Sequence, residues 1–328
     1  MQGKAATDHM GKAQTDAPHP GAAHVTIIMA TRNGGRHLRE QLASIAAQTH
    51  RNWTLYVSDD GSTDDTRQIL KDFGQRHPLH LVEGPRRGAA ANFLSALSQP
   101  DLPKGVIALA DQDDVWLKGK LARGLRRMAA AARVMGNHDA PVLYAAESML
   151  SDHQLTPKTI SRSGRVRPAF APSLAQNLFA GHSIMLSPAA LALVRQARGT
   201  EAVIWHDWWL YQLLAGAGAG LVLDPTPLVI YRQHGGNAIG APGGAVAGIR
   251  RMQMVLGGEW RRTIAAHTAT LSANEALLTP EARQILAAFH AAPGAGPGRI
   301  RQLRALGIRR SSRMGDLLLA SAALIGRL

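Results

Sequence analysis

The clearest structural signal in this chain is the stretch Leu109-Ala110-Asp111-Gln112-Asp113-Asp114-Val115-Trp116. It ends an apolar run that begins at Gly105, and it places three carboxylates within four residues directly after that run. A short apolar run with such boundaries predicts a buried strand of a parallel sheet. Because ligands of open α/β sheets bind beyond the carboxyl ends of the strands, we expect the acidic cluster in a binding site.

The acidic cluster has two interpretations. Clustered carboxylates repel one another, and burying them without partners is costly. A hard divalent cation, Mg²⁺ or Mn²⁺, would remove that cost by binding the oxygen atoms of Asp111 and Asp113. The alternative is a solvated acidic loop, or a cap for the helix predicted over residues 117–134. The spacing of the carboxylates leaves both interpretations open.

The same alternation of strand and helix extends on both sides of this stretch. Strands are predicted at 25–30, 53–58, 79–82 and 105–110, and helices at 37–48, 63–73 and 89–97. Strands that alternate with helices of this length indicate crossover units and a parallel sheet. The rhythm then changes, with strands predicted at 142–146, 182–186, 221–223 and 228–231, a helix at 206–214, and an irregular loop at 151–172.

Composition and charge limit the kinds of protein that this can be. The chain has 328 residues, 45% of them hydrophobic, which is enough for one large α/β domain with an appendage. It has no cysteine, which excludes disulfides and Cys-ligated metal centres and fits a cytoplasmic location. Its net charge of +14 indicates an anionic partner such as a nucleotide, a nucleic acid or an acidic membrane.

The two ends of the chain differ from its middle. Residues 1–23 lack periodicity and any apolar segment of a signal peptide, and we predict a disordered tail there. Residues 241–328 hold 12 arginines against four acidic residues, a net charge of +8. A linker is predicted at 240–244, followed by helices at 248–256, 260–271, 280–290 and 299–306. No apolar run approaches the ~18 residues needed to span a bilayer.

Five motifs, in order along residues 24–240, resemble those of family 2 glycosyltransferases of the rhamnosyltransferase-like subgroup. They are Val25-Thr26-Ile27-Ile28-Met29-Ala30-Thr31-Arg32-Asn33, Ser58-Asp59-Asp60-Gly61-Ser62-Thr63-Asp64-Asp65-Thr66, Asp111 to Trp116, His206-Asp207-Trp208-Trp209-Leu210, and Tyr231-Arg232-Gln233-His234-Gly235-Gly236-Asn237. The resemblance implies a GT-A fold, Rossmann-like and mostly parallel with flanking helices, over residues 24–240, with a basic helical extension over 241–328.

The resemblance also implies the donor site. Nucleotide-sugar binding is expected at Ala30, Arg32, Asn33, Asp60 and Asp111. A carboxylate such as Asp60 can accept a hydrogen bond from the N3–H of uracil or thymine. For residues 59–62 taken alone, an Asp-Gly turn that caps the next helix is the alternative.

Metal binding is implied at three positions. Asp113 matches the family's ligand of Mg²⁺ or Mn²⁺, Asp111 matches the residue nearest ribose and metal, and His234 follows a late strand where some GT-A enzymes place a histidine ligand. Asp114 matches a position of less uniform role, which a helix cap would also explain. Arg232 is expected to hold a phosphate of the donor.

Asp207 matches the family's general base, which removes the proton of the acceptor hydroxyl and so inverts the stereochemistry. The family pattern has an acidic residue before this aspartate, whereas this chain has His206. Capping of a helix by Asp207 is compatible with the same role. An acceptor platform is expected from Trp205, Trp208 and Trp209, or else a place for them in the core. Asn177 and Gly181 fall at the acceptor-side loop.

The expected function is therefore inverting, metal-dependent transfer of a sugar, such as rhamnose, from a dTDP- or UDP-sugar. The acceptor would be a hydroxyl of a surface-polysaccharide or lipid-linked glycan, and the protein would be cytoplasmic or peripheral on the inner face of the plasma membrane. A basic nucleic-acid-binding protein and an inactive glycosyltransferase-like protein are the alternatives, although no nucleic-acid partner is expected. The sequence lacks the Gly-x-Gly-x-x-Gly, Walker A, His-Glu-x-x-His and Gly-x-Ser-x-Gly motifs of other enzyme classes.

Overall fold

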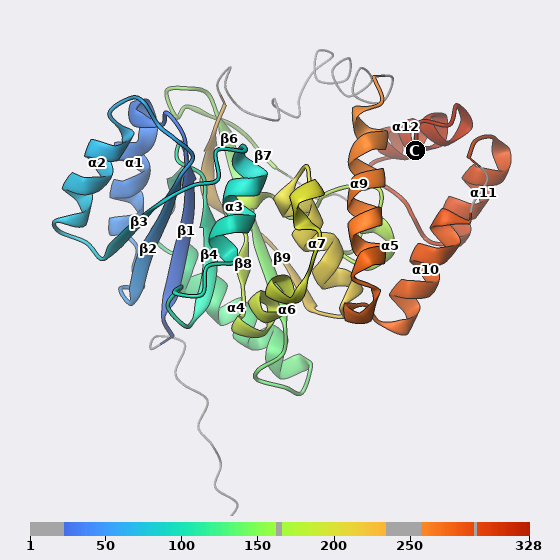
Figure 1. Ribbon diagram of the computed structural model, residues 1–328, viewed down its shortest axis with the longest axis horizontal. Coiled ribbons are helices and arrows are strands. Elements are labelled where there is room, and N and C mark those ends of the chain that lie inside the picture. The colour runs from blue at the N-terminus through green and yellow to red at the C-terminus, as the bar shows by residue number, and fades with distance from the viewer. Residues whose placement is uncertain (1–22, 162–165, 234–256, 292–293) are drawn as a thin grey trace, which may run out of the picture.

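The computed structural model describes residues 23–161, 166–233, 257–291 and 294–328 (Figure 1). The predicted N-terminal tail, apart from residue 23, lies outside these ranges, as do the predicted linker at 240–244 and the predicted helix at 248–256. The metal ligand predicted at His234 also lies outside the described residues.

The first half of the chain alternates strands and helices as the sequence predicts. Its elements are β1 (Val25–Thr31), α1 (Gly35–Ala46), β2 (Trp53–Asp59), α2 (Thr66–Gly74), β3 (Leu79–Glu83), α3 (Ala89–Leu97) and β4 (Val106–Ala110). These strands are parallel, in the order β3-β2-β1-β4. The chain leaves β1 towards β2 on one side, and β4 pairs on the other, so a topological switch point lies between β1 and β4.

The second half adds antiparallel pairs to this sheet. Its elements are β5 (Val115–Trp116), α4 (Lys120–Val134), β6 (Val142–Ser151), β7 (Pro157–Ile160), α5 (Phe170–Ser173), η1 (Gly181–Ser183), β8 (Met185–Leu186), α6 (Pro188–Gln196), η2 (Thr200–Ala202), α7 (His206–Gly216) and β9 (Gly220–Arg232). The described residues thus form a nine-stranded sheet in the order β3-β2-β1-β4-β8-β6-β9-β5, with β7 beside β6. Strand β8 is antiparallel to both of its neighbours, so the sheet is mixed.

Two local predictions differ from the structure, and in both cases the cause is pairing between strands. Val115 and Trp116 pair with β9 as β5, so α4 begins at Lys120 rather than at residue 117. The interpretation of Asp114 as a cap of that helix is therefore wrong. The sequence predicts two short strands around the prolines of residues 221–231, but β9 is one strand. The β6–β9 register is interrupted between Ala146 and Ser148, and the prolines lie opposite that irregularity.

Helices cover both faces of the sheet. Val25, Ile27 and Met29 of β1 lie in one buried cluster with residues of α1, α2 and α4. Ile28 belongs to the other cluster, which includes residues of α3, α6 and α7. This alternation is the period of two of a strand that is buried on both faces.

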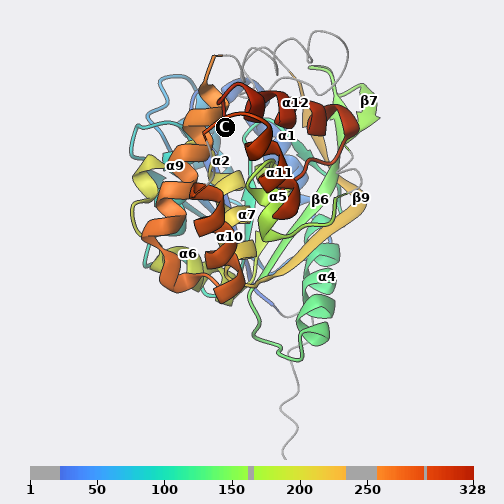
Figure 2. The same cartoon turned by 90° about the vertical axis from the view of Figure 1, so that its right-hand side faces the viewer.

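The C-terminal helices pack against the rest of the fold rather than standing apart. They are α9 (Glu259–Ala273), η3 (Glu275–Leu277), α10 (Pro280–His290), α11 (Pro297–Ala305) and α12 (Arg313–Leu324), and they lie together at the end of the molecule opposite α1 and α2 (Figures 1 and 2). Trp260, Leu286 and Leu319 lie in the same buried cluster as Trp209 of α7. No helix in the described part of the chain combines the length and the apolar character needed to cross a bilayer.

Candidate active site

The polar residues identified in the sequence follow the carboxyl ends of β1, β2 and β4. Asp60 follows β2, Arg32 follows β1, and Asp111 follows β4. Because these strands are parallel neighbours, their carboxyl ends meet at one edge of the sheet. The switch point between β1 and β4 is the position where open α/β sheets bind ligands.

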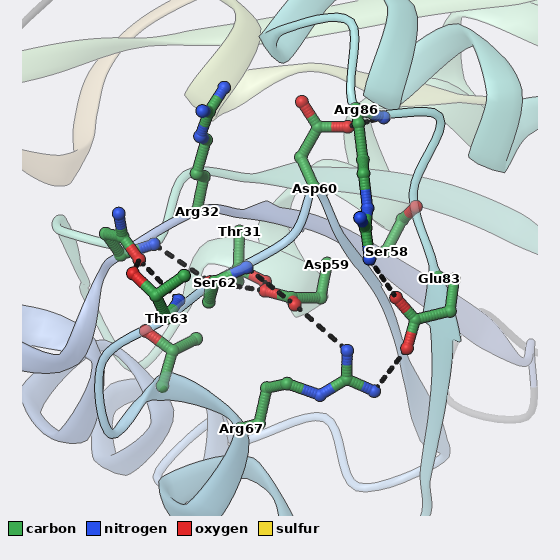
Figure 3. A network of polar contacts seen from close by, with 12 residues as sticks. Thr31, Arg32, Ser58, Asp59, Asp60, Ser62, Thr63, Arg67, Glu83 and Arg86 are labelled. Atoms are coloured by element: carbon green, nitrogen blue, oxygen red, sulfur yellow. Dashed lines mark hydrogen bonds and ion pairs between the residues drawn. The ribbon is translucent and has the colours of Figure 1, made fainter.

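The consecutive residues Asp59 and Asp60 point to opposite sides of the end of β2 (Figure 3). Asp59 is fully buried and accepts hydrogen bonds from the hydroxyls of Thr31 and Ser62, at 2.9 and 2.5 Å. It also lies 3.5 Å from the guanidinium of Arg67. This network braces the loop after β2. The alternative interpretation of residues 59–62 as a helix cap is wrong, because α2 starts at Thr66 and its N-cap residue is the one directly before it.

Asp60 points to the same side as Arg32 in Figure 3. Its two oxygens accept hydrogen bonds from the backbone N–H groups of Arg86 and Gly88, at 2.6 and 2.8 Å. Each carboxylate oxygen has two lone pairs, so each retains the capacity to accept one more bond. Asp60 therefore has a fixed orientation and remaining acceptor capacity.

The loop after β1 is held by polar contacts with two neighbouring loops. Gln112 clamps the backbone of Arg32, accepting from its N–H at 2.9 Å and donating to its carbonyl at 3.1 Å, which leaves the exposed guanidinium group outside this clamp. Asn33 adopts a positive φ of 49° and accepts from the N–H of Thr63 at 2.8 Å. Ala30, one residue before the end of β1, is half-buried.

Three side chains, two from the loop between β4 and β5 and one from η1, form a group that could hold a metal ion. They are Asp111, Asp114 and His182, whose ligand atoms all lie within 4.8 Å of one another. The sequence motifs do not identify His182 as a metal ligand. Its signal in the sequence is weak, because it is one of 14 histidines and lies 68 residues or more from both aspartates.

Burial sets the protonation preferences of this group. It raises the pKa of Asp111 and of Asp114 well above the usual value, and the neighbouring carboxylates add to both shifts. Burial lowers the pKa of His182 to about 3, so its imidazole is neutral at physiological pH. The Nε2 atom of His182 lies 2.6 Å from the hydroxyl of Ser148, and the ring stacks on Tyr231. Crowded acids beside a neutral imidazole are a suitable donor set for a cation.

A buried lysine lies close to this group. Lys120 is fully buried, its amino group has no hydrogen-bond partner among the described residues, and it lies 3.8 Å from the ring centre of Trp116. Burial lowers its pKa to about 7, and the charge of Asp114 acts in the opposite direction. Lys120 is therefore a partial counter-charge for the buried carboxylates, and the sequence motif gives no sign of it.

Arg232 and Asp113 contact each other at the end of β9. The buried guanidinium of Arg232 donates to the carbonyls of Asp113 and His153, at 3.0 and 2.6 Å, and pairs with Glu40. To bind a phosphate, it would have to give up some of these bonds. The backbone N–H of Arg232 donates to Asp114 at 3.2 Å, so this arginine ties β9 to the acidic loop.

Asp207 lies in the first turn of α7 and is oriented by two backbone groups. One oxygen accepts from the N–H of Trp208 at 2.7 Å, and the other accepts from the N–H of Gly181 at 3.1 Å. A Cβ atom at position 181 would lie 3.0 Å from Nε2 of His206 and 3.3 Å from Cβ of Asp207. Glycine thus permits the close approach of η1 to α7. The ring of His206 stacks on Phe93 with centroids 4.2 Å apart.

One cavity of about 640 Å³ brings several of these residues together. Its lining includes Asp111, Asp207 and His182, together with Arg87 and Gly88 at the start of α3. We call this cavity the main cleft. Of the three tryptophans expected as an acceptor platform, only Trp205 lines it. Trp208 and Trp209 are buried in the core, as the alternative interpretation proposed.

The family model and the curated relatives that resemble this chain are all glycosyltransferases. Residues 26–178 match the model of Glycosyl transferase family 2. The dTDP-rhamnosyl transferase RfbG of Shigella flexneri is 25% identical over 250 residues, which are 72% of this chain and 82% of that protein. The UDP-Glc:alpha-D-GlcNAc-diphosphoundecaprenol beta-1,3-glucosyltransferase WfgD of Escherichia coli is 33% identical over 104 residues, 32% of this chain and 40% of that protein.

The fold also has a counterpart among solved structures. The crystal structure of S. aureus TarS 1-349 superposes with a TM-score of 0.51 at 15% sequence identity, covering 86% of this chain and 90% of that one. At this identity the likeness concerns the fold. The predicted α/β architecture with C-terminal helices is confirmed over nearly the whole length of both chains.

Proposed function

Because this chain carries a family 2 glycosyltransferase domain on a GT-A fold, we propose that it is an inverting, metal-dependent enzyme. It would move a sugar from a nucleotide-sugar donor to a hydroxyl of a glycan. The observation that carries this proposal is that one cavity is lined both by Asp207, the proposed base, and by Asp111 of the acidic group. Proton removal from the acceptor and charge compensation at the donor phosphates would then occur in one space.

The nucleotide is assigned to the edge of the sheet at β1 and β2. Asp60 has a fixed carboxylate with spare lone pairs, which suits the N3–H of uracil or thymine. Ala30, Arg32 and Asn33 are assigned to the same pocket, where the exposed guanidinium of Arg32 would add positive charge beside a nucleotide. The nucleobase would thus be recognised at the edge of the sheet near Asp60, and the sugar would lie in the main cleft.

A divalent cation, Mg²⁺ or Mn²⁺, is assigned to the group formed by Asp111, Asp114 and His182. The residues present fit such an ion, because one oxygen of Asp114 is buried without a hydrogen-bond partner among the described residues and the neutral His182 is the form that binds metals. Asp111, Asp114 and His182 would hold it. Asp113, whose charge acts on both aspartates, is the further ligand that the family resemblance implies. When bound, the ion would neutralise the diphosphate and the charge that develops on the leaving nucleotide.

Asp207 is assigned the role of general base. Hydrogen bonds from Gly181 and Trp208 hold its carboxylate at the wall of the main cleft. It would take the proton of the acceptor hydroxyl while the oxygen attacks the anomeric carbon from the face opposite the leaving nucleotide. That geometry of attack inverts the configuration of the transferred sugar.

The donor sugar is assigned as a deoxyhexose such as rhamnose, carried on dTDP or UDP. Support comes from the likeness to a dTDP-rhamnosyl transferase and from the apolar part of the cleft. Ala90, Phe93 and Val203 contribute carbon-rich surface to its lining. Such surface suits a C6 methyl group better than a C6 hydroxyl, because a buried hydroxyl without a partner is costly.

The C-terminal helices are assigned to an anionic membrane surface, which would hold a lipid-linked acceptor near the cleft. Four apolar side chains at α12 and directly after it are between 50% and 67% exposed, namely Met314, Leu317, Leu324 and Ile325. Exposed arginines lie near them in sequence, namely Arg301, Arg304, Arg309, Arg313 and Arg327. Exposed apolar residues flanked by basic ones favour an anionic lipid interface.

A screen of nucleotide sugars by melting temperature, with and without Mn²⁺, tests the proposal. A donor at ~100 times its dissociation constant should stabilise the fold by about 2.7 kcal/mol, and only when the metal is present. No stabilisation by any dTDP- or UDP-sugar would contradict it. Formation of a glycoside product separates an active enzyme from a glycosyltransferase-like protein that binds donor without transfer.

A further inference from the structure

A second hollow of about 350 Å³ lies next to the main cleft. The two share Leu150, Ser161 and Ala180 as walls. Beyond these shared residues, the second hollow extends over β6 and β7 to Ser311 of the C-terminal region. It therefore continues the cleft away from β1 and β2, the end of the sheet assigned to the nucleotide.

Two consecutive residues of β6 face the two hollows. Ser148 lines the main cleft and contacts His182, whereas Glu147 lines the second hollow. The pairing of β6 with β9 is interrupted at this point, since Ala146 pairs with Asp224 but Ser148 pairs with Val229. Such irregularities redirect side chains at functional edges of sheets. The interruption leaves Glu147 outside the regular register of β6.

The lining of the second hollow is amphipathic. Glu147, only 8% exposed, accepts a hydrogen bond from the hydroxyl of Ser161 at 2.6 Å. Asn177 and Thr159 add further polar side chains, and Leu178 and Ile160 add apolar surface. A carboxylate with an amide and hydroxyls can bind several sugar hydroxyls, while aliphatic side chains pack on the C–H groups of a pyranose ring.

The C-terminal region completes this hollow. The backbone N–H of Ser311 donates to Gln176 at 2.9 Å, and the guanidinium of Arg310 donates to the carbonyl of Ala175 at 2.9 Å. These bonds fix Ser311 against the segment that carries Asn177. The hollow thus has a fixed wall on the side of the C-terminal helices.

We propose that this second hollow is an acceptor subsite, which binds the sugar unit next to the one whose hydroxyl is glycosylated at Asp207. The inference rests on the proposed function, because it needs an acceptor glycan in the main cleft. An acceptor entering from the side of β6 would place its reacting hydroxyl at Asp207 and its next ring against Glu147. The enzyme would accordingly recognise acceptors of two or more sugar units.

Binding of acceptor fragments tests this subsite without a turnover assay. Saturation-transfer difference NMR is run with UDP and Mn²⁺ present, using mono-, di- and trisaccharide fragments of bacterial surface polysaccharides. At least one disaccharide should bind about tenfold more tightly than its terminal monosaccharide, a difference of about 1.4 kcal/mol. Glu147→Gln and Leu178→Trp should each remove that gain, the first by removing the charge and the second by filling the hollow.

Lys158→Ala is the matched control, because Lys158 lies on β7 next to a lining residue but does not itself line the hollow. It should keep the gain of the unaltered protein. If no fragment binds better as a disaccharide, or if the gain persists in both variants, the subsite is wrong. Donor-dependent melting shifts on the same samples separate the two proposals, since their presence leaves the proposed function intact and their absence overturns both.

Discussion

The backbone N–H of Gly181 donates a hydrogen bond to the carboxylate of Asp207 at 3.1 Å. This bond joins η1 to the first turn of α7, two segments that lie 26 residues apart. Because His182 directly follows Gly181, the same contact fixes the distance between the proposed base and the acidic group. The spacing of the proposed catalytic groups therefore depends on a backbone contact as well as on side chains.

Replacement of Asp207 by Asn should preserve donor binding and abolish transfer. The amide is nearly isosteric and can still accept one backbone hydrogen bond, but it cannot take the acceptor's proton. Loss of a general base typically costs ~10² to 10⁴ in rate. Single-turnover transfer with saturating donor measures the effect, with the exposed Asp139→Asn as control. Transfer at nearly the normal rate would exclude Asp207 as the base.

Gly181→Ala should slow transfer by displacing Asp207, the proposed base, without changing its chemical nature. The added Cβ would meet His206 at 3.0 Å and Asp207 at 3.3 Å, so the base must move by a few tenths of an ångström. Misplacement on the scale of an ångström costs up to about 10²-fold in rate. We expect kcat to fall while the donor dissociation constant stays level. Gly119→Ala is the control, because its Cβ would meet nothing within 4 Å; equal kinetics in the two variants would refute the positioning role.

Asp113→Ala and Asp114→Asn should each abolish metal-dependent donor binding while the fold remains intact. Asp113 is the ligand expected from the sequence, and Asp114 belongs to the group that the structure brings together. Removing one carboxyl group from the crowded cluster relieves its mutual repulsion, so the melting temperature without metal should stay level or rise. Isothermal titration of nucleotide with Mn²⁺ measures the affinity. An unchanged value in either variant removes that residue from the metal site.

His267 should make the stability of the fold depend on pH. Its Nε2 atom accepts from the N–H groups of Ile204 and Trp205, both at 3.3 Å, which requires a neutral ring. Burial lowers the pKa of His267 to about 4, from an ordinary value of 6.5. Between these values the unfolded chain binds more protons, so stability is present in full above pH 6.5 and is lost as pH falls towards 4. The shift corresponds to about 3 kcal/mol.

Urea unfolding of the unaltered protein and of His267→Gln across this range isolates the contribution of His267. The other titrating groups contribute equally to the two proteins and cancel in the difference. The difference in unfolding free energy should therefore shrink as the pH falls, because only the unaltered protein loses the contribution of His267. His138→Gln, at an exposed position after α4, is the control substitution of a histidine outside this site. A difference for His267→Gln that does not change with pH would refute the prediction.

The exposed face of α12 should bind anionic vesicles. Full-length protein should co-sediment with them at low salt and less so at high salt, since each arginine near such a surface contributes about 1 kcal/mol. Truncation is an unsuitable test, because Leu303 and Leu319 lie in the shared core. Substitution of Met314 and Leu317 by Ser removes exposed surface instead, and should reduce binding. Val134→Ser, at an 89% exposed position of α4, is the control. Absence of co-sedimentation with anionic vesicles at low salt would refute the membrane assignment, and the basic C-terminal region would then have another partner.

The amino-acid pattern is sufficient to predict the first half of the sheet and the edge at which the candidate site residues lie. Strand and helix periods are local, so the predicted bounds of β1 to β4 agree with the observed ones to within a residue or two, and those of α3 are identical. Parallel strands bring their carboxyl ends to one edge, which is why the sequence alone places Asp60 and Asp111 together. The family motifs added the expectation for Asp207.

Contacts between residues far apart in the chain become visible in the folded structure alone. His182 lies beside Asp111 and Asp114, some 70 residues away in the sequence. The guanidinium of Arg232 contacts Asp113, His153 and Glu40. Strand β9 continues through two prolines. The C-terminal helices, which the sequence marked only as basic and helical, share a core with α7, and Ser311 between two of them closes one side of the second hollow. Such contacts arise from packing between elements, and a local sequence period carries no information about which faces of distant elements pack together.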